Sequence, residues 1–211
     1  MSNRQTASGV TVAVAKGRIL DDARRRLEAA GWVWPLGEES RQLWVGPDDT
    51  HPGIIIARAK DVATLVARGI ADLGIVGLDV MRENPDAEVL EVADLEFAQC
   101  RVVLAGRSPA WPDGPCQIAT KYQRIARQFF QEREHPISIV PMSGSLELAP
   151  LIGLAPYIVD IVDTGRTLRE HGLVEVTTIL HSSARLIANP SHWRTKSEVV
   201  AFRESLRSAA S

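Results

Sequence analysis

The sequence is poor in cysteine and in long apolar runs, and each shortage excludes a class of protein. Its 211 residues include only two cysteines, Cys100 and Cys116, which are too few and too far apart for a disulfide scaffold or a zinc site. No apolar stretch reaches the roughly 20 residues that a membrane-spanning helix needs. Residues 1–9 are polar and lack the apolar core of a secretory signal. These absences predict a protein of the reducing cytoplasm without a membrane partner.

A strong charge of either sign is also missing. Lysine and arginine number 24 against 26 aspartates and glutamates, so the net charge is −2 and gives no electrostatic reason to expect a nucleic acid partner. The five histidines show no metal-ligand spacing. A hydrophobic content of 45% is ordinary for a globular protein, and the length allows one large domain or two small ones.

Strand-like and helix-like patterns alternate along the chain. Strands are expected at residues 10–15, 54–57, 73–76, 101–105, 117–120, 137–140, 158–162, 174–180 and 185–188. Helices are expected at 20–30, at 61–69 with Asp61 as the cap, at 122–132, at 145–152, in a short segment ending at Gly172, and at 196–206. The proline-rich stretch 108–115 is interpreted as a loop within the second half. This alternation predicts an α/β protein with largely parallel sheets.

The most informative motif follows the apolar strand at 158–162. Asp163-Thr164-Gly165-Arg166-Thr167 is a strand-to-helix turn, where free backbone N–H groups and the helix dipole favour a phosphate. Gly165 allows close approach of the backbone, and the threonines add hydroxyl donors. Asp160 and Asp163 suit sugar hydroxyls or Mg²⁺. The motif predicts a phosphorylated sugar as ligand, although an ordinary turn with a capping threonine fits the same residues.

A much longer resemblance surrounds this motif. The segment Glu147–Leu168, ELAPLIGLAPYIVDIVDTGRTL, resembles ATP phosphoribosyltransferase, the enzyme that opens histidine biosynthesis, in its short form without the C-terminal regulatory domain. Further blocks that resemble the family follow in its order: 12–18, Ser40-Arg41, 57–62, 69–80, 118–122 and 143–145. Many ordered blocks along one chain are more specific than any single motif.

The resemblance implies a two-lobed α/β fold like that of type II periplasmic binding proteins, with a cleft between the lobes. Residues 1–97 and 184–211 would form the first lobe. Residues 98–183 would form the second, which carries the phosphate-binding turn.

The implied reaction joins two polyanions. Adenine N1 of ATP attacks the anomeric carbon of phosphoribosyl pyrophosphate (PRPP) with inversion, and pyrophosphate leaves. Fixed arginines and Mg²⁺ suit such a leaving group. By resemblance, Arg18 and Arg41 are the catalytic cations, and Arg58 and Lys16 are further phosphate ligands. Arg18, Arg58 and Lys16 each follow an expected strand, and open α/β sheets bind ligands at such strand ends.

The remaining site residues are implied by the same resemblance. Residues 163–167 would cradle the 5′-phosphate, with Asp160 on the ribose hydroxyls. Glu147 would face the ribose or Mg²⁺, or is an ordinary helix-surface carboxylate. The family leaves the position of Asp163 free, and no protein ligand of Mg²⁺ is assigned. Tyr122 is interpreted either as a stacking partner of adenine or as a core residue.

Three positions depart from the family's usual pattern: Ala63 for proline, Pro156 for an acidic residue and Leu78 for lysine. The last removes a cation beside Asp79, so that loop is not assigned as a ligand. The chain's length resembles the short form of the family. That form implies a homodimer within a hetero-oligomer that contains a regulatory subunit like histidyl-tRNA synthetase.

Two other functions fit part of these observations. A solute-binding protein of the same fold is disfavoured by the absent signal peptide and by the phosphate turn with its arginines. A phosphoribosyltransferase acting on another base shares the turn, but the blocks around Arg18, Arg41 and Arg58 favour ATP.

Overall fold

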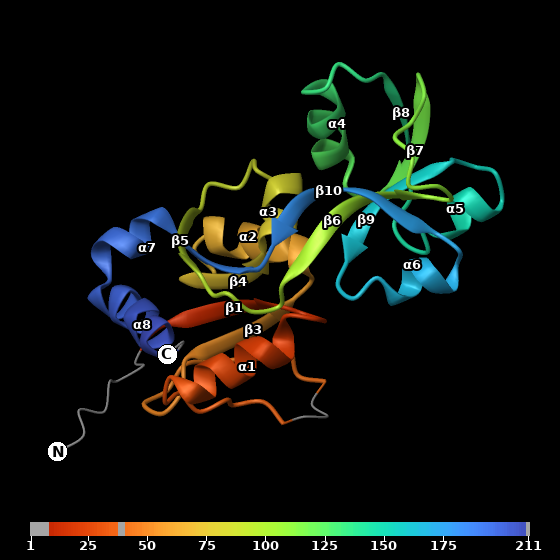
Figure 1. Cartoon of the computed structure of the whole chain (residues 1–211). Coiled ribbons are helices and arrows are strands. Elements are labelled where there is room, and N and C mark those ends of the chain that lie inside the picture. The colour runs from red at the N-terminus through yellow and green to blue at the C-terminus, as the bar shows by residue number, and fades with distance from the viewer. Residues whose placement is uncertain (1–8, 38–40, 210–211) are drawn as a thin grey trace. The chain divides into compact units, whose positions relative to one another are not determined.

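The computed structural model describes residues 9–37 and 41–209, and in it the chain divides into two compact units (Figure 1). The first comprises Met1–Ala98 with Ser183–Ser211, and the second Gln99–Ser182. The sequence placed these boundaries at residues 97 and 183. Ser40 and most of the polar N-terminal segment lie outside the described residues.

Unit 1 is built on a six-stranded sheet of order β2-β3-β1-β4-β11-β5. Its elements are β1 (Thr11–Ala15), α1 (Leu20–Ala29), β2 (Trp44–Val45), β3 (Gly53–Ala57), α2 (Ala59–Ala67), β4 (Leu73–Gly77), α3 (Leu78–Glu83), β5 (Leu90–Asp94), β11 (Ala184–Ala188), α7 (Pro190–Thr195) and α8 (Ser197–Ser208). Strand β1 runs parallel to β3 and β4, whereas the other three pairs are antiparallel. The three parallel strands therefore end at the same edge of the sheet.

The core of unit 1 forms because β1 and β4 are apolar at nearly every position and are buried throughout. Leu27 on the inner face of α1 and Phe202 of α8 belong to the same buried cluster. Trp32 stacks on Phe202 with ring centroids 5.1 Å apart, and its indole N–H donates to Ser205 Oγ at 2.9 Å. The C-terminal helix thus packs against the N-terminal helix and its sheet.

Unit 2 carries a five-stranded sheet of order β10-β6-β9-β7-β8. Its elements are β6 (Cys100–Gly106), β7 (Cys116–Thr120), α4 (Gln123–Gln131), β8 (Ile137–Pro141), α5 (Leu148–Leu151), β9 (Tyr157–Val162), α6 (Arg166–Glu170) and β10 (Val174–Ser182). Two apolar clusters fill it, one containing Phe129 and Phe130 of α4 and the other containing Ala149 of α5 and Leu168 of α6. Strand β7 runs parallel to both β8 and β9, so the loops after these three strands share one edge.

The predicted α/β class is confirmed, but the expectation of largely parallel sheets is wrong. Only four of the nine strand pairs in the described chain are parallel. The chain leaves unit 1 after β5 and returns to it through β11, and these two strands pair with each other antiparallel. Strands β6 and β10, which begin and end unit 2, also pair with each other antiparallel. Outgoing and returning segments that lie side by side must run in opposite directions.

Two helix boundaries also differ from the expectation. Helix α2 begins at Ala59 with Arg58 as its N-cap, so Asp61 lies in the first turn and is not the cap. The helix expected over 145–152 is reduced to α5, because Ser145 has a φ of 49°, outside the right-handed helical region. The expected loop at 108–115 does connect β6 to β7 within unit 2.

Candidate active site

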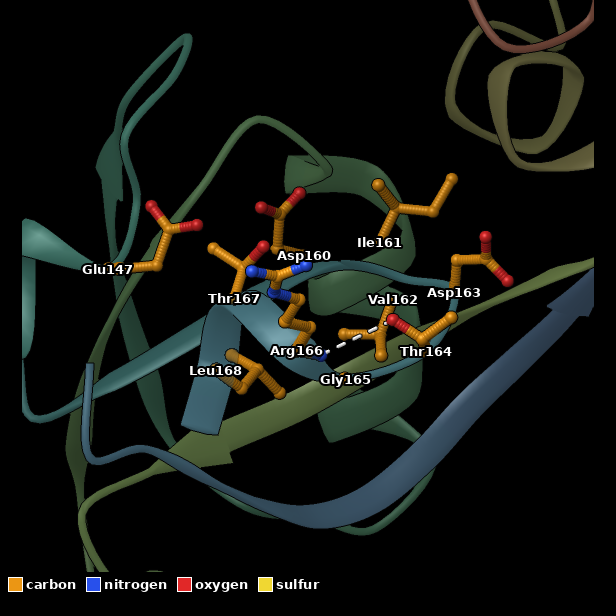
Figure 2. Close-up of a pocket in the computed structure, with 10 residues that line it drawn as sticks. All are labelled: Glu147, Asp160, Ile161, Val162, Asp163, Thr164, Gly165, Arg166, Thr167 and Leu168. Carbon is orange, nitrogen blue, oxygen red and sulfur yellow. Dashed lines mark hydrogen bonds between the residues drawn. The ribbon is translucent and has the colours of Figure 1, made fainter. Parts of the chain in front are cut away.

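A small pocket lies in unit 2 where β9 ends and α6 begins (Figure 2). It is lined by the contiguous residues Asp160–Leu168 and by Glu147 from the segment before α5. Its volume is about 130 Å³, roughly that of four water molecules in the liquid. The predicted phosphate turn and the two carboxylates that the sequence assigned beside it therefore line the same pocket.

The turn itself is built around Gly165. This residue has a φ of 72°, a left-handed conformation that glycine adopts without strain, and it forms the N-cap of α6. The backbone N–H of Arg166 donates a long hydrogen bond of 3.4 Å to Thr164 Oγ1, drawn dashed in Figure 2. In the described part of the chain, the N–H groups of Thr164, Gly165 and Thr167 have no hydrogen-bond acceptor. The turn can therefore offer several donors to an anion.

The helix dipole contributes less than the sequence suggested. Helix α6 contains only five residues, Arg166–Glu170, so few peptide dipoles add along its axis. The side chain of Arg166 is committed on the surface, because its Nε donates to Glu170 Oε1 at 2.7 Å. The donor capacity of the site thus resides mainly in backbone N–H groups and in the two threonine hydroxyls.

Asp160 is a largely buried carboxylate of the pocket, with 19% of its side chain exposed. Burial raises its pKa, and the nearby negative charge of Glu147 raises it further, while the ammonium of Lys121 opposes both effects. Lys121 Nζ lies 3.2 Å from Asp160 Oδ1. Attraction to this lysine offsets part of the desolvation of a buried charge.

Lys121, which contacts Asp160 of the pocket, was not predicted from the sequence as a site residue. It lies in the family-like block 118–122 and directly follows β7, the parallel neighbour of β9. The sequence shows only that Lys121 follows an expected strand; the structure adds that this strand pairs with β9, so that the two loops meet at one edge. The tyrosine beside it, Tyr122, is 5% exposed and belongs to the α4 cluster, which supports the core interpretation.

The predicted cations lie in unit 1, at the edge where the parallel strands end. Lys16 and Arg18 follow β1, and Arg58 follows β3. The backbone N–H of Lys16 donates to Ala57 O at 2.7 Å, which ties the two loops together. Arg41 lies two residues before Leu43, whose carbonyl accepts from Ile56 N–H at 2.8 Å, so it reaches the same edge. All four side chains are exposed, and Arg18 donates to the carbonyl oxygen of Ala98.

Asp163 also lines the pocket, whereas Leu78 and the two cysteines are not among its lining residues. Figure 2 shows the carboxylate of Asp163 apart from those of Glu147 and Asp160, and Asp163 is exposed. Leu78 is buried as the first residue of α3, so it occupies a core position. Cys100 and Cys116, at the starts of β6 and β7, are reduced cysteines. Within residues 9–37 and 41–209 no three His, Cys, Asp or Glu side chains form a metal-binding group, and no helix is long and apolar enough to cross a membrane.

Comparison with known proteins gives this site its context. The family model of ATP phosphoribosyltransferase matches residues 58–208. The ATP phosphoribosyltransferase of Bacillus velezensis is 44% identical over 193 residues, which cover 90% of this chain and 90% of the relative. Among solved structures, the ATP phosphoribosyl transferase (HisG:HisZ) complex from Thermotoga maritima matches with a TM-score of 0.80 and 31% identity, covering 95% of this chain and 98% of that one.

More distant structures show the fold alone. The periplasmic VFT2 domain of Bordetella pertussis BvgS aligns with a TM-score of 0.59 at 14% identity, over 96% of this chain and 88% of that domain. It confirms the two-lobed fold class of periplasmic binding proteins. The family match and the extensive identity decide between that fold's binders and its enzymes: the chain belongs to the ATP phosphoribosyltransferase family, the glycosyltransferases that catalyse the first step of histidine biosynthesis.

Proposed function

We propose that the pocket of unit 2 binds the 5′-phosphate of PRPP. The observation that carries this assignment is the turn at 163–167, whose N–H groups at Thr164, Gly165 and Thr167 lack acceptors within the described chain. Thr164 and Thr167 line the same pocket, and Arg166 adds a positive charge at its rim. Backbone donors around a left-handed glycine form a concave anion site.

The carboxylates of the pocket are assigned to the ribose. Asp160 and Glu147 line it together, and a carboxylate is an acceptor for the 2′- and 3′-hydroxyls. Phosphoribosyltransferases generally use a divalent metal, and Mg²⁺ commonly takes one or two protein carboxylates together with substrate phosphates. This donor set fits Mg²⁺, which would neutralise charge on the departing pyrophosphate.

The cations of unit 1 are assigned to the pyrophosphate and to the phosphates of ATP. Arg18 and Arg41 act in catalysis, because negative charge builds up on the leaving oxygen as the ribose becomes oxocarbenium-like. Arg58 and Lys16 hold phosphate oxygens. Adenine N1 attacks with its own lone pair, so no covalent nucleophile and no general base are required.

The assembly and its location are also assigned by analogy. The Thermotoga maritima relative was solved as a complex of two kinds of subunit. By this analogy, the present chain forms homodimers that assemble with a regulatory subunit like histidyl-tRNA synthetase, which receives the histidine signal. A biosynthetic enzyme that uses ATP and PRPP operates in the cytoplasm.

The direct experiment is formation of phosphoribosyl-ATP from ATP, PRPP and Mg²⁺ by the purified chain, with pyrophosphatase to pull the equilibrium. Product shows that the chain is catalytically complete without the partner. Binding of PRPP without product makes the catalyst partner-dependent. If the chain neither binds PRPP nor forms product, the proposed site is contradicted.

Arg18→Ala tests the catalytic assignment within the same assay. We expect turnover at saturating ATP and PRPP to fall about 100-fold, because a preorganised charge on the leaving group is lost. The melting temperature should stay unchanged, since the side chain is exposed. Turnover equal to that of the parent enzyme removes Arg18 from the catalytic residues.

A further inference from the structure

Two arginines outside the family-like segment Glu147–Leu168 hold the phosphate turn from its carbonyl side. Arg169 of α6 donates from Nη1 to the carbonyl oxygen of Thr164 at 3.1 Å. Arg101 of the neighbouring strand β6 donates from Nη1 to the carbonyl oxygen of Asp163 at 3.4 Å. Two consecutive carbonyls of the turn therefore each have a guanidinium donor.

These contacts fix the direction of the N–H groups. A carbonyl and the N–H of the next residue belong to one planar trans peptide unit and point in opposite directions. The Asp163 carbonyl shares its peptide with the N–H of Thr164, and the Thr164 carbonyl shares its peptide with the N–H of Gly165. Holding both carbonyls toward the arginines therefore aims both N–H groups away from them. These are two of the three N–H groups without an acceptor in the described turn.

Both arginines are themselves constrained. Arg101 donates from Nη2 to Glu175 Oε2 at 2.8 Å, and Thr178 Oγ1 donates to the other oxygen of that carboxylate at 2.6 Å. Arg169 packs over Gly165, where an added Cβ would lie 3.2 Å from Nη1. The glycine therefore serves twice, because it permits the positive φ and leaves room for the guanidinium.

We propose that Arg101 and Arg169 are positioning residues for the 5′-phosphate of PRPP. They orient the peptide units of the turn, and their positive charges polarise those units so that the N–H groups become stronger donors. Glu175 and Thr178 hold Arg101 in place. This inference rests on the proposed phosphate site and adds the residues that shape it.

The test is the affinity for ribose 5-phosphate and for pyrophosphate, each measured by calorimetry on the full chain. Arg101→Gln and Arg169→Gln should each weaken ribose 5-phosphate about tenfold, because a charge-assisted hydrogen bond to the turn is lost. Pyrophosphate affinity and the KM for ATP should stay unchanged, which a general loss of structure would not allow. Arg169→Lys keeps the charge and a donor, so it should recover part of the affinity.

Arg107→Gln is the matched control. Arg107 is exposed, as Arg169 is, and it donates to a main-chain carbonyl, that of Leu151 at 3.4 Å, but beyond the other end of β6. Its variant should bind ribose 5-phosphate as the parent does.

Thr167→Ala distinguishes the proposed phosphate site from the proposed positioning roles of Arg101 and Arg169. If it binds ribose 5-phosphate as tightly as the parent, the phosphate site is misplaced and both proposals fail. If it loses affinity while both glutamine variants stay within about twofold of the parent, the site stands and the positioning roles are overturned. Parallel loss of pyrophosphate affinity in the glutamine variants also overturns them, because the effect would then not be local.

Discussion

At the scale of single residues, the candidate site is marked by a conflict between stability and function. Asp160 is largely buried at the end of β9, and Lys121 at 3.2 Å offsets only part of the cost of its charge, since the pKa remains raised. A core chosen for stability alone would place an uncharged side chain there. A carboxylate at this position makes sense if its charge is needed by the ligand, and replacing it with a neutral isostere tests this.

Asp160→Asn should make the enzyme more stable and worse at binding PRPP. The pKa of Asp160 is raised in the folded state, so the folded protein holds this proton more tightly than the unfolded chain does. The resulting penalty is fully present at neutral pH and is relieved as the pH falls through the raised pKa. The melting temperature should therefore rise at pH 7.5, by about 2–4 °C for each kcal/mol of penalty removed.

The pH dependence provides the internal control. The advantage of the asparagine variant should shrink as the pH is lowered, because the parent's aspartate then becomes neutral as well. Asp163→Asn, at an exposed position of the same turn, should not change the melting temperature. A melting temperature of Asp160→Asn below that of the parent at neutral pH would show that the Lys121 pair stabilises the fold.

At the scale of elements, the sequence predicted the strands and helices with a strong apolar pattern and missed several that lack one. The buried strand β1 and the amphipathic helix α1 lie where expected, because burial of an apolar face decides both. Helix α3 was missed, since it begins directly after Gly77 at the end of the apolar strand β4 and its six residues are too few to show a helical period. Strand β5 was missed because its exposed and half-buried positions carry no strong pattern.

In the candidate site, too, the features that are local in the sequence could be predicted and the long-range ones could not. The turn at 163–167 could be predicted because its glycine and threonines are adjacent in the sequence. Lys121, Arg101 and Arg169 could not be assigned, because their roles depend on which strands neighbour β9 and on how α6 is oriented. Pairing between strands is a long-range property that residue spacing alone does not give.

A second long-range cluster joins the C-terminal helices to the sheet of unit 1. Asp72, 3% exposed, accepts from the backbone N–H of Thr11 at 2.7 Å. Its other oxygen lies 2.6 Å from Lys196 Nζ and 2.7 Å from His192 Nδ1. Asn189 caps α7 and donates to the last carbonyls of α2. One carboxylate thus connects the start of β1 with the segment that contains α7 and α8.

Asp72→Ala should lower the free energy of unfolding by about 2–4 kcal/mol, because it leaves a buried N–H and a partly buried lysine without a partner. Asp72→Asn keeps an acceptor for Thr11 and should lose less. Urea denaturation followed by circular dichroism measures both, with Asp113→Ala, an exposed loop aspartate, as the control. A loss of less than about 0.5 kcal/mol for the alanine variant would place the cluster among ordinary surface interactions.

At the scale of the whole molecule, the charge distribution matters more than the total. The chain carries a net charge of −2, yet both of its substrates are polyanions. Binding them therefore depends on local positive potential, and unit 1 gathers Lys16, Arg18, Arg41 and Arg58 at one edge of its sheet. Exposed charges of this kind attract ligands through solvent and are sensitive to salt.

Pyrophosphate binding should consequently weaken as salt is added. Raising NaCl from 0.1 to 1 M shortens the Debye length from about 10 to about 3 Å, so we expect at least a roughly fivefold loss of affinity at constant Mg²⁺. Arg41→Ala and Arg58→Ala should each bind more weakly at low salt and lose less on going to high salt, because part of the attractive potential is already gone. Arg133→Ala, an exposed position of unit 2 whose guanidinium packs over Phe129, should keep the parent's full dependence. Ribose 5-phosphate, held by oriented backbone N–H groups, should respond less to salt than pyrophosphate does. If pyrophosphate affinity is independent of salt, the edge of unit 1 is not where the leaving group is held, and the assignment of Arg18 and Arg41 to its departure fails with it.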